Sequence, residues 1–180
     1  MKAGFAVGRV AVLGAGEEGT WVARWAAEAG YRVTLEDLMP ARRRLAAARM
    51  EAAGAGSAIF YAASVEEAVR DADLVIDFVP DEMESKLEIF SLLDRMAPPH
   101  TILATPTRVM SIADLASCTY RGERCVGLRL PVLLAGCEGS LAVEVVHAPG
   151  VLAGVVDAVS GFWRALGAAV TVSVDGAALP

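Results

Sequence analysis

Two patterns of apolar residues alternate along the chain. Short apolar runs indicate buried strands, and stretches with an apolar residue every three or four positions indicate amphipathic helices. Such alternation is typical of a doubly wound α/β fold, in which helices cover both faces of a single, mainly parallel sheet. We therefore predict one domain over residues 1–180. The first predicted strand ends at Leu13, and the others span 31–36, 57–62, 72–79, 100–104, 124–130, 141–147 and 168–174. The predicted helices span 20–29, 40–53, 64–70, 81–96, 111–116 and 151–167.

Local signals support two of these helices. Ser64 stands three residues before Glu67, the spacing of a capping box at a helix start. In the helix predicted over 81–96, one side carries four apolar residues, which we expect to face the core: Leu87, Phe90, Leu93 and Met96.

The first strand leads directly into the pattern G-x-G-x-x-G, formed by Gly14, Gly16 and Gly19. A helix and a second strand follow, and the acidic pair Glu36 and Asp37 stands at the end of that strand. This order of elements is the dinucleotide-binding fingerprint. The first glycine permits a tight turn, the second lets backbone N–H groups approach a pyrophosphate, and the third lets the helix pack closely on the sheet.

The residues after the second strand bear on the choice of cofactor. Asp37 can accept both hydroxyls of the adenosine ribose and repel a 2′-phosphate, so we expect NAD rather than NADP. Arg42, Arg43 and Arg44 are the alternative signal, because guanidinium groups near that pocket can hold such a phosphate. We interpret these three arginines as an exposed face of the second helix.

Glu17 and Glu18 lie between the second and third glycine. Carboxylates stabilise the first turn of a helix, but here they also oppose the charge of a diphosphate. At about 6 Å and an effective dielectric of about 20, each repulsive pair costs about 3 kcal/mol before salt screening. We therefore expect weak NAD binding, with the loss of the cofactor as the alternative.

Composition excludes several classes of protein. Apolar residues make up 55% of the chain, and the net charge of −6 disfavours nucleic acid and anionic membranes as partners. No stretch has the roughly 18 uncharged apolar residues of a spanning helix, and Arg9 and the glycines interrupt the apolar N-terminus, so we expect a cytoplasmic protein without a signal peptide. Cys118, Cys125 and Cys137 lack metal-ligand spacing, so we expect structural thiols and no metal site.

Together, the motifs resemble the NAD-binding domain of 3-hydroxyacyl-CoA dehydrogenases, collinearly over nearly the whole chain. One short insertion, near residues 134–140, interrupts the resemblance. Its segments are Val10–Gly19, Asp37, Asp71–Asp77, Val79–Glu82, Lys86, Leu103–Thr107, Ser111–Ile112, Gly127–Leu128 and Val143–Val146.

The resemblance implies further cofactor contacts. In that family, a segment after the fourth strand and a lysine on the following helix lie along the cofactor, and the matching residues here are Pro80, Asp81 and Lys86. The alternative for Lys86 is a solvated charge on the helix surface.

The resemblance fails at the positions that carry the family's chemistry. Its Asn-Thr-Ser segment is Pro106-Thr107-Arg108 here, and Arg129 stands where the family has its catalytic histidine. Arginine does not exchange a proton at neutral pH, and a positioned general base is worth about 10²–10⁴ in rate. Glu144 matches the glutamate that orients that histidine, so we expect it to pair with Arg129. Neither His100 nor His147 is expected to replace the base. His100 precedes the fifth strand, away from the carboxyl ends where ligands bind in such sheets. His147, at the end of the seventh strand, is interpreted as a solvated histidine, with a position facing the crevice as the alternative.

In the family, a helical domain follows the last strand, and this chain stops at Pro180. The resemblance therefore implies apolar surface for a homodimer or a separate helical subunit. Three functions remain open: an NAD-binding module without competent catalytic residues, an oxidoreductase of fatty acid metabolism completed by a partner chain, with Arg108 and Arg129 holding an acidic substrate, or an interaction protein that has lost the cofactor.

Overall fold

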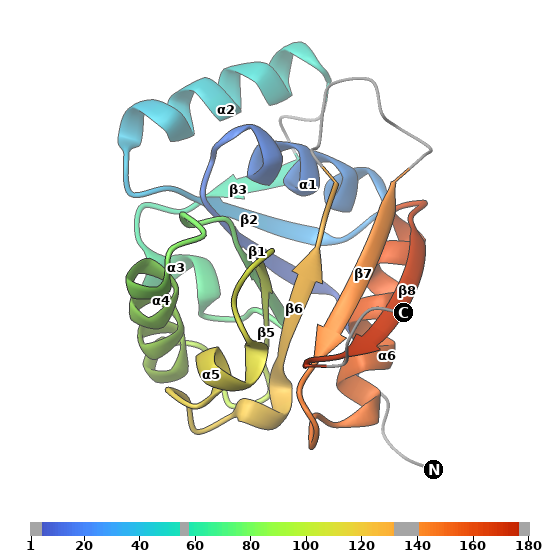
Figure 1. The fold of residues 1–180 in the computed structure, drawn as a ribbon. Helices are drawn as coiled ribbons and strands as arrows, with labels where there is room; N and C mark the ends of the chain where they lie inside the picture. The colour runs from blue at the N-terminus through green and yellow to red at the C-terminus, as the bar shows by residue number, and fades with distance from the viewer. Residues whose placement is uncertain (1–4, 55–57, 132–140, 177–180) are drawn as a thin grey trace.

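Eight strands form one sheet in the computed structural model, which describes residues 5–54, 58–131 and 141–176 (Figure 1). The strand order is β3-β2-β1-β4-β5-β6-β7-β8. The first six strands are parallel, β7 runs antiparallel to β6, and β8 runs parallel to β7. The strands are β1 (Arg9–Leu13), β2 (Arg32–Glu36), β3 (Ile59–Tyr61), β4 (Leu74–Asp77), β5 (Ile102–Pro106), β6 (Cys125–Arg129), β7 (Ala142–His147) and β8 (Ala169–Val174).

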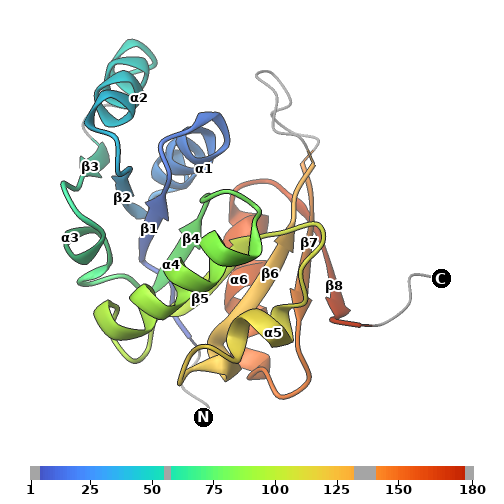
Figure 2. The ribbon, with the colours of Figure 1, turned by 60° about the vertical axis from the view of Figure 1, so that its left-hand side comes forward.

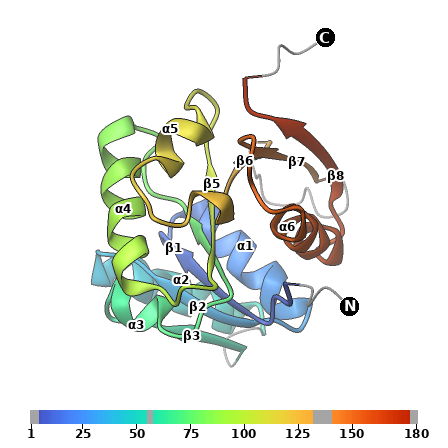
Figure 3. The ribbon, with the colours of Figure 1, turned by 90° about the horizontal axis from the view of Figure 1, so that it is seen from below.

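Helices cover both faces of the sheet (Figure 3). Helices α1 and α6 pack on one face, and α3, α4 and α5 pack on the other. The predicted doubly wound α/β fold is therefore confirmed. The helices are α1 (Glu17–Glu28), α2 (Pro40–Ala52), α3 (Val65–Val69), α4 (Met83–Met96), α5 (Ile112–Ala116) and α6 (Ala153–Ala165), with a short 3₁₀ helix at Gly122–Arg124.

Each face of the sheet carries its own core. Trp163 and Phe162 of α6 lie under the first face with Val12 and Leu128, and Phe90 of α4 lies on the second. Because the central strands are buried on both sides, they read as continuous apolar runs rather than as alternating ones.

Two local predictions have different outcomes. The capping prediction is confirmed, since the hydroxyl of Ser64 accepts a hydrogen bond from the backbone N–H of Glu67. The predicted apolar side of the 81–96 helix is partly wrong: Met96 is exposed and Leu87 is half-buried, whereas Lys86 and Ile89 are buried beside Phe90 and Leu93. The buried side of the helix therefore includes Lys86, because this lysine has a buried partner, which is described below.

The reversal of β7 decides which residues share an edge of the sheet. The carboxyl ends of β1, β4, β5 and β6 meet at one edge, where the amino end of β7 joins them (Figure 2). This edge also receives the start of α1, so it is the edge at which ligands bind in open α/β sheets. In the part of the chain that the structure describes, no helix is long and apolar enough to cross a membrane.

Candidate functional site

The glycine loop connects β1 to α1. In the sheet β1 lies between β2 and β4, so the strand order reverses at this point. Gly14 has a φ of 103°, and its N–H donates to the carbonyl oxygen of Glu36 at 2.7 Å. A Cβ on Gly19 would lie 1.9 Å from the carbonyl oxygen of Gly14. The tight turn and the close helix packing therefore both depend on the absence of a side chain.

Gly16 has a different environment. It is exposed, and a Cβ built on it would have no atom within 4 Å. It is the N-cap of α1, and no side chain caps the helix there. The first N–H groups of a helix have no partner within the helix and carry partial positive charge. The loop thus presents open backbone N–H donors, which fit a diphosphate.

Asp37 fastens the end of β2 to the glycine loop. Its side chain is only 6% exposed, and it accepts hydrogen bonds from the N–H groups of Ala15 at 2.9 Å and Met39 at 2.8 Å. A carboxylate accepts about four hydrogen bonds, so about two positions remain for the hydroxyls of a ribose. Asp37 also lines a cavity of about 340 Å³ beside Gly14, Arg42 and Pro80.

The three arginines of α2 are not equivalent. Arg44 is exposed, as expected for an exposed helix face. For Arg43 that expectation is wrong: it is half-buried and donates to the carbonyl oxygen of Asp37 at 2.6 Å. Arg42 is exposed but lines the same cavity, with Nη1 3.9 Å from Oδ2 of Asp37. Burial raises the pKa of Glu36 nearby, the negative charge of Asp37 adds to this effect, and Arg43 opposes it.

A second cavity, of about 380 Å³, lies across the glycine loop over the ends of β4, β5 and β6. Its charged lining residues are Glu18, Asp81 and Arg108. Glu17 is exposed and does not line either cavity, whereas Glu18 is half-buried. Pro80 lines both cavities and thus lies between them. The oxygen Oδ2 of Asp81 accepts a hydrogen bond from the backbone N–H of Arg108 at 3.1 Å.

Lys86 is buried beneath these two cavities rather than exposed on the helix surface. Its side chain is 1% exposed, and Nζ is 2.7 Å from Oδ1 of the fully buried Asp77 at the end of β4. The alternative of a solvated charge is therefore wrong. Burial raises the pKa of Asp77, and the charge and hydrogen bond of Lys86 oppose that effect. Lys86 lines neither of the two cavities, so it supports the site from below.

Arg129 and Glu144 face each other across β6 and β7, as the resemblance led us to expect. They are register partners, and Nη1 of Arg129 is 3.0 Å from Oε1 of Glu144. The hydroxyl of Ser173 on β8 donates to the same oxygen. The hydrogen bond from Ser173 lowers the pKa of Glu144 most, burial opposes this effect, and Arg129 lowers the pKa further. The glutamate is thus occupied by an ion pair.

Arg108 and Arg129 come together at the edge of the sheet. Both line a small cavity of about 240 Å³ with Thr107, Ser111 and Asp175. The exposed guanidinium group of Arg108 has no hydrogen bond or ion pair to another described residue. Asp175 instead accepts hydrogen bonds from the hydroxyl of Ser111 and the N–H of Ala113 at the start of α5.

The histidines lie away from this edge. His147 is the last residue of β7, in agreement with the strand predicted over 141–147, and its register partner is Val126 near the start of β6. Because β7 is antiparallel to β6, His147 lies at the opposite edge from Arg129. His100 is also remote, and its Nε2 lies 3.5 Å from Oδ1 of Asp73. Neither histidine therefore lies where a base is needed.

The cysteines of the described chain are consistent with structural thiols. Cys118 and Cys125 are free, and burial raises the pKa of Cys125 to about 12. Cys137 and the insertion near residues 134–140 lie outside the described residues.

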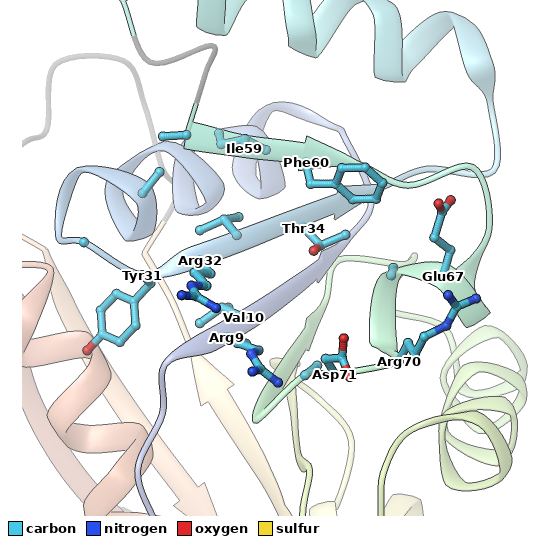
Figure 4. Close-up of a pocket in the computed structure, with 16 residues that line it drawn as sticks. Arg9, Val10, Tyr31, Arg32, Thr34, Ile59, Phe60, Glu67, Arg70 and Asp71 are labelled. Carbon is cyan, nitrogen blue, oxygen red and sulfur yellow. The ribbon is translucent and has the colours of Figure 1, made fainter.

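A larger hollow, of about 850 Å³, lies over β1, β2 and β3 on the side of α3 (Figure 4). Its lining includes Arg9, Arg32 and Arg70, the carboxylate of Asp71 and the exposed ring of Phe60. It lies away from the glycine loop, and its charges are of both signs. Size alone therefore does not identify the functional site.

Sequence reasoning missed the partners that complete these contacts. Asp77 was identified as part of a buried strand and of the family resemblance, but without a partner, and Ser173 only as part of the last strand. Their roles depend on which strand ends and helix faces meet, and no local signal in the sequence gives that information.

The glycine loop, the carboxylate after β2 and the crevice between β1 and β4 define a Rossmann-type dinucleotide-binding domain. The chain belongs to the 3-hydroxyacyl-CoA dehydrogenase family: residues 9–176 match the family described as "3-hydroxyacyl-CoA dehydrogenase, NAD binding domain".

Similarity to individual proteins supports this family membership. The chain is 33% identical over 136 residues to the probable 3-hydroxybutyryl-CoA dehydrogenase of Bacillus subtilis, covering 67% of this chain and 47% of that protein. It is 30% identical over 184 residues to the mitochondrial hydroxyacyl-coenzyme A dehydrogenase of Sus scrofa, and the match covers 89% of this chain and 57% of that protein. The structure of a 3-hydroxyacyl-CoA dehydrogenase from Archaeoglobus fulgidus superposes with a TM-score of 0.80 at 25% identity, covering 94% of this chain and 57% of that one. The chain thus spans about half the length of the curated relatives it matches.

Proposed function

We propose that the chain binds NAD across the glycine loop and does not by itself catalyse the dehydrogenation of a hydroxyacyl substrate. The observation that carries the first part is the coupling of Asp37 to Ala15. One carboxylate both fixes the loop and keeps acceptor positions beside a cavity of about 340 Å³.

In this proposal each cofactor residue has a defined part. The amides around Gly16 hold the diphosphate, Asp37 holds the adenosine ribose, and Pro80 and Asp81 border the second half of the cofactor. Lys86 acts indirectly, because its ion pair fixes Asp77 at the end of β4. When bound, NAD would supply a hydride acceptor at this edge of the sheet.

The second part rests on Arg129 and Glu144. A dehydrogenase of alcohols needs a group that takes the hydroxyl proton, and arginine does not exchange it at neutral pH. Glu144, which matches the orienting glutamate, is occupied by Arg129 and Ser173. Arg129 and Glu144, the described residues at this point, therefore provide charge, and neither is free to accept the proton.

NAD is favoured over NADP by the position of the Asp37 carboxylate, since a 2′-phosphate would meet its negative charge. Arg42 is the opposing feature, because it lies in the same cavity. The proposal predicts tighter binding of NAD, and comparison of both cofactors by calorimetry tests it.

A second candidate function is an oxidoreductase for an acidic substrate, completed by a partner chain. The observation in its favour is that Arg108 and Arg129 line one cavity. The outer strand β8 is consistent with a partner, because Val172 and Val174 are exposed there and no described strand pairs with its outer edge. We propose a homodimer or a helical subunit at this edge, and sedimentation of the purified chain tests the homodimer.

The decisive experiment follows the fluorescence of Trp21 and Trp25 in α1 during titration with NADH. Saturable quenching supports the cofactor site. If millimolar NADH causes no quenching, the remaining hypothesis is an interaction protein that has lost the cofactor. In parallel, oxidation of NADH with acetoacetyl-CoA is measured for the chain alone. Turnover above the blank would overturn the proposal that the chain lacks competent catalytic groups.

A further inference from the structure

Glu17 and Glu18 are neighbours in the first turn of α1, but their side chains have different surroundings. Glu17 is exposed, whereas Glu18 is half-buried and lines the cavity of about 380 Å³. Among the described residues, the Glu18 carboxylate has neither a hydrogen bond nor an ion pair. It is therefore a charge that lines a cavity, and no described residue neutralises it.

The position of this cavity indicates which part of a dinucleotide it receives. Asp37 marks the adenosine side, over the ends of β1 and β2. A dinucleotide that crosses the glycine loop from there has its other nucleoside over the ends of β4, β5 and β6. The second cavity lies there, so under the proposed function it receives the nicotinamide ring.

The charge of this ring depends on its redox state: the oxidised ring carries a positive charge and the reduced ring is neutral. Two carboxylates of the cavity, Glu18 and Asp81, attract the cationic form. The guanidinium group of Arg108 opposes them, but Arg108 is exposed and also borders the neighbouring cavity. The balance is therefore negative on the side of the glycine loop.

Resting on the proposed NAD site, we infer that Glu18 is a specificity-determining residue that favours the oxidised cofactor over the reduced one. The same carboxylate also repels the diphosphate, which is common to both forms. Its effect on absolute affinity and its effect on the preference between forms are thus separate quantities.

The test measures the dissociation constants of NAD⁺ and NADH by calorimetry for the wild type, Glu18→Gln and Glu17→Gln. The two variants remove the same charge from the same helical turn, and only Glu18 lines the cavity. At a separation of about 10 Å and an effective dielectric of about 20, Glu18→Gln lowers the ratio of the NADH constant to the NAD⁺ constant about tenfold. Glu17→Gln changes both constants together, and the ratio changes less than about twofold because water and salt screen the exposed charge.

Arg108→Gln provides a test of the opposite sign, since removing the cation raises the same ratio. The melting temperature of each variant confirms that its fold is intact. An unchanged ratio in Glu18→Gln, or an equal change in Glu17→Gln, overturns the inference while leaving the NAD site in place. If the wild type binds neither NAD⁺ nor NADH at millimolar concentration, the proposed function and the inference are both overturned.

Discussion

The two halves of the crevice differ in how much of the family's pattern they keep. On the side of β1 and β2, the glycine loop, the open N-terminus of α1 and Asp37 are all present and joined by hydrogen bonds. On the side of β5 and β6, the resemblance matches Arg108 and Arg129 to the family's polar and catalytic positions, and Glu144 is held in an ion pair. Under the proposed function, one sheet keeps a binding site while its reaction site has changed.

The largest expected effect tests the buried ion pair of Lys86 and Asp77, which lies at the end of β4 beneath both halves. Lys86→Met leaves Asp77 buried without its partner, so we expect a loss of about 3–5 kcal/mol in the free energy of unfolding. Lys86 opposes the rise that burial causes in the pKa of Asp77, so this pKa rises further in the variant. The folded variant then holds the proton of Asp77 more tightly than the folded wild type, so the loss is greater at neutral pH than at acidic pH. Denaturant unfolding at several pH values measures it.

The control is the double variant Lys86→Met with Asp77→Leu. Replacing both partners of a buried pair by apolar residues is often neutral, so most of the stability should return. A loss below about 1 kcal/mol in the single variant would contradict the buried ion pair.

The next effect separates two glycines of one loop. Gly19→Ala places a Cβ against the carbonyl oxygen of Gly14, and we expect it to cost about 3 kcal/mol of stability. Gly16→Ala meets no atom within 4 Å, so it should change stability by less than about 1 kcal/mol and act mainly on NAD affinity. Unfolding curves and NAD titrations of the two variants measure both quantities. Equal losses of stability would contradict the assigned roles.

A smaller effect tests the adenosine side directly. Asp37→Ala removes the proposed hydrogen bonds to the ribose, so NAD affinity should fall about 10–100-fold, with less effect on NADP. Calorimetry of both cofactors measures this. Arg44→Ala is the control, since Arg44 is exposed and lines no cavity near Asp37. Equal losses of NAD and NADP affinity would refute the ribose role.

The sequence was sufficient to predict the elements and the glycine loop with the carboxylate that follows β2, because both depend on local patterns. The strand, the three glycines and the carboxylate stand at fixed spacings, and the apolar runs follow the strands to within a few residues. The surroundings of the Lys86 and Glu18 side chains were not predictable from such patterns. Each depends on which direction a helix face takes relative to strands distant in the sequence, as the burial of Lys86 against Asp77 illustrates.

The smallest expected effect concerns the reaction side. The lowered pKa of Glu144 contributes stability above the ordinary pKa of a glutamate, and this stability is lost as pH falls through the lower folded value. Ser173→Ala should therefore cost less than about 1 kcal/mol at pH 7, because the ion pair is partly exposed, and a smaller amount near pH 3, where more of Glu144 is protonated.

Denaturant unfolding at the two pH values measures the difference. Thr171→Val, on the same strand, is the control and should show no such dependence on pH. An equal loss for Ser173→Ala at both pH values would indicate lost packing rather than a charged partner.

The most direct measurement is a titration of the isotope-labelled chain with NAD⁺, followed by the amide resonances in NMR spectra. NAD⁺ held on the glycine loop shifts the amides of residues 14–19 and of Asp37, with saturation at a common dissociation constant. If these amides remain unchanged at millimolar NAD⁺, or if only the groove around Arg9 and Arg32 responds, the assignment of the nucleotide to the crevice is wrong.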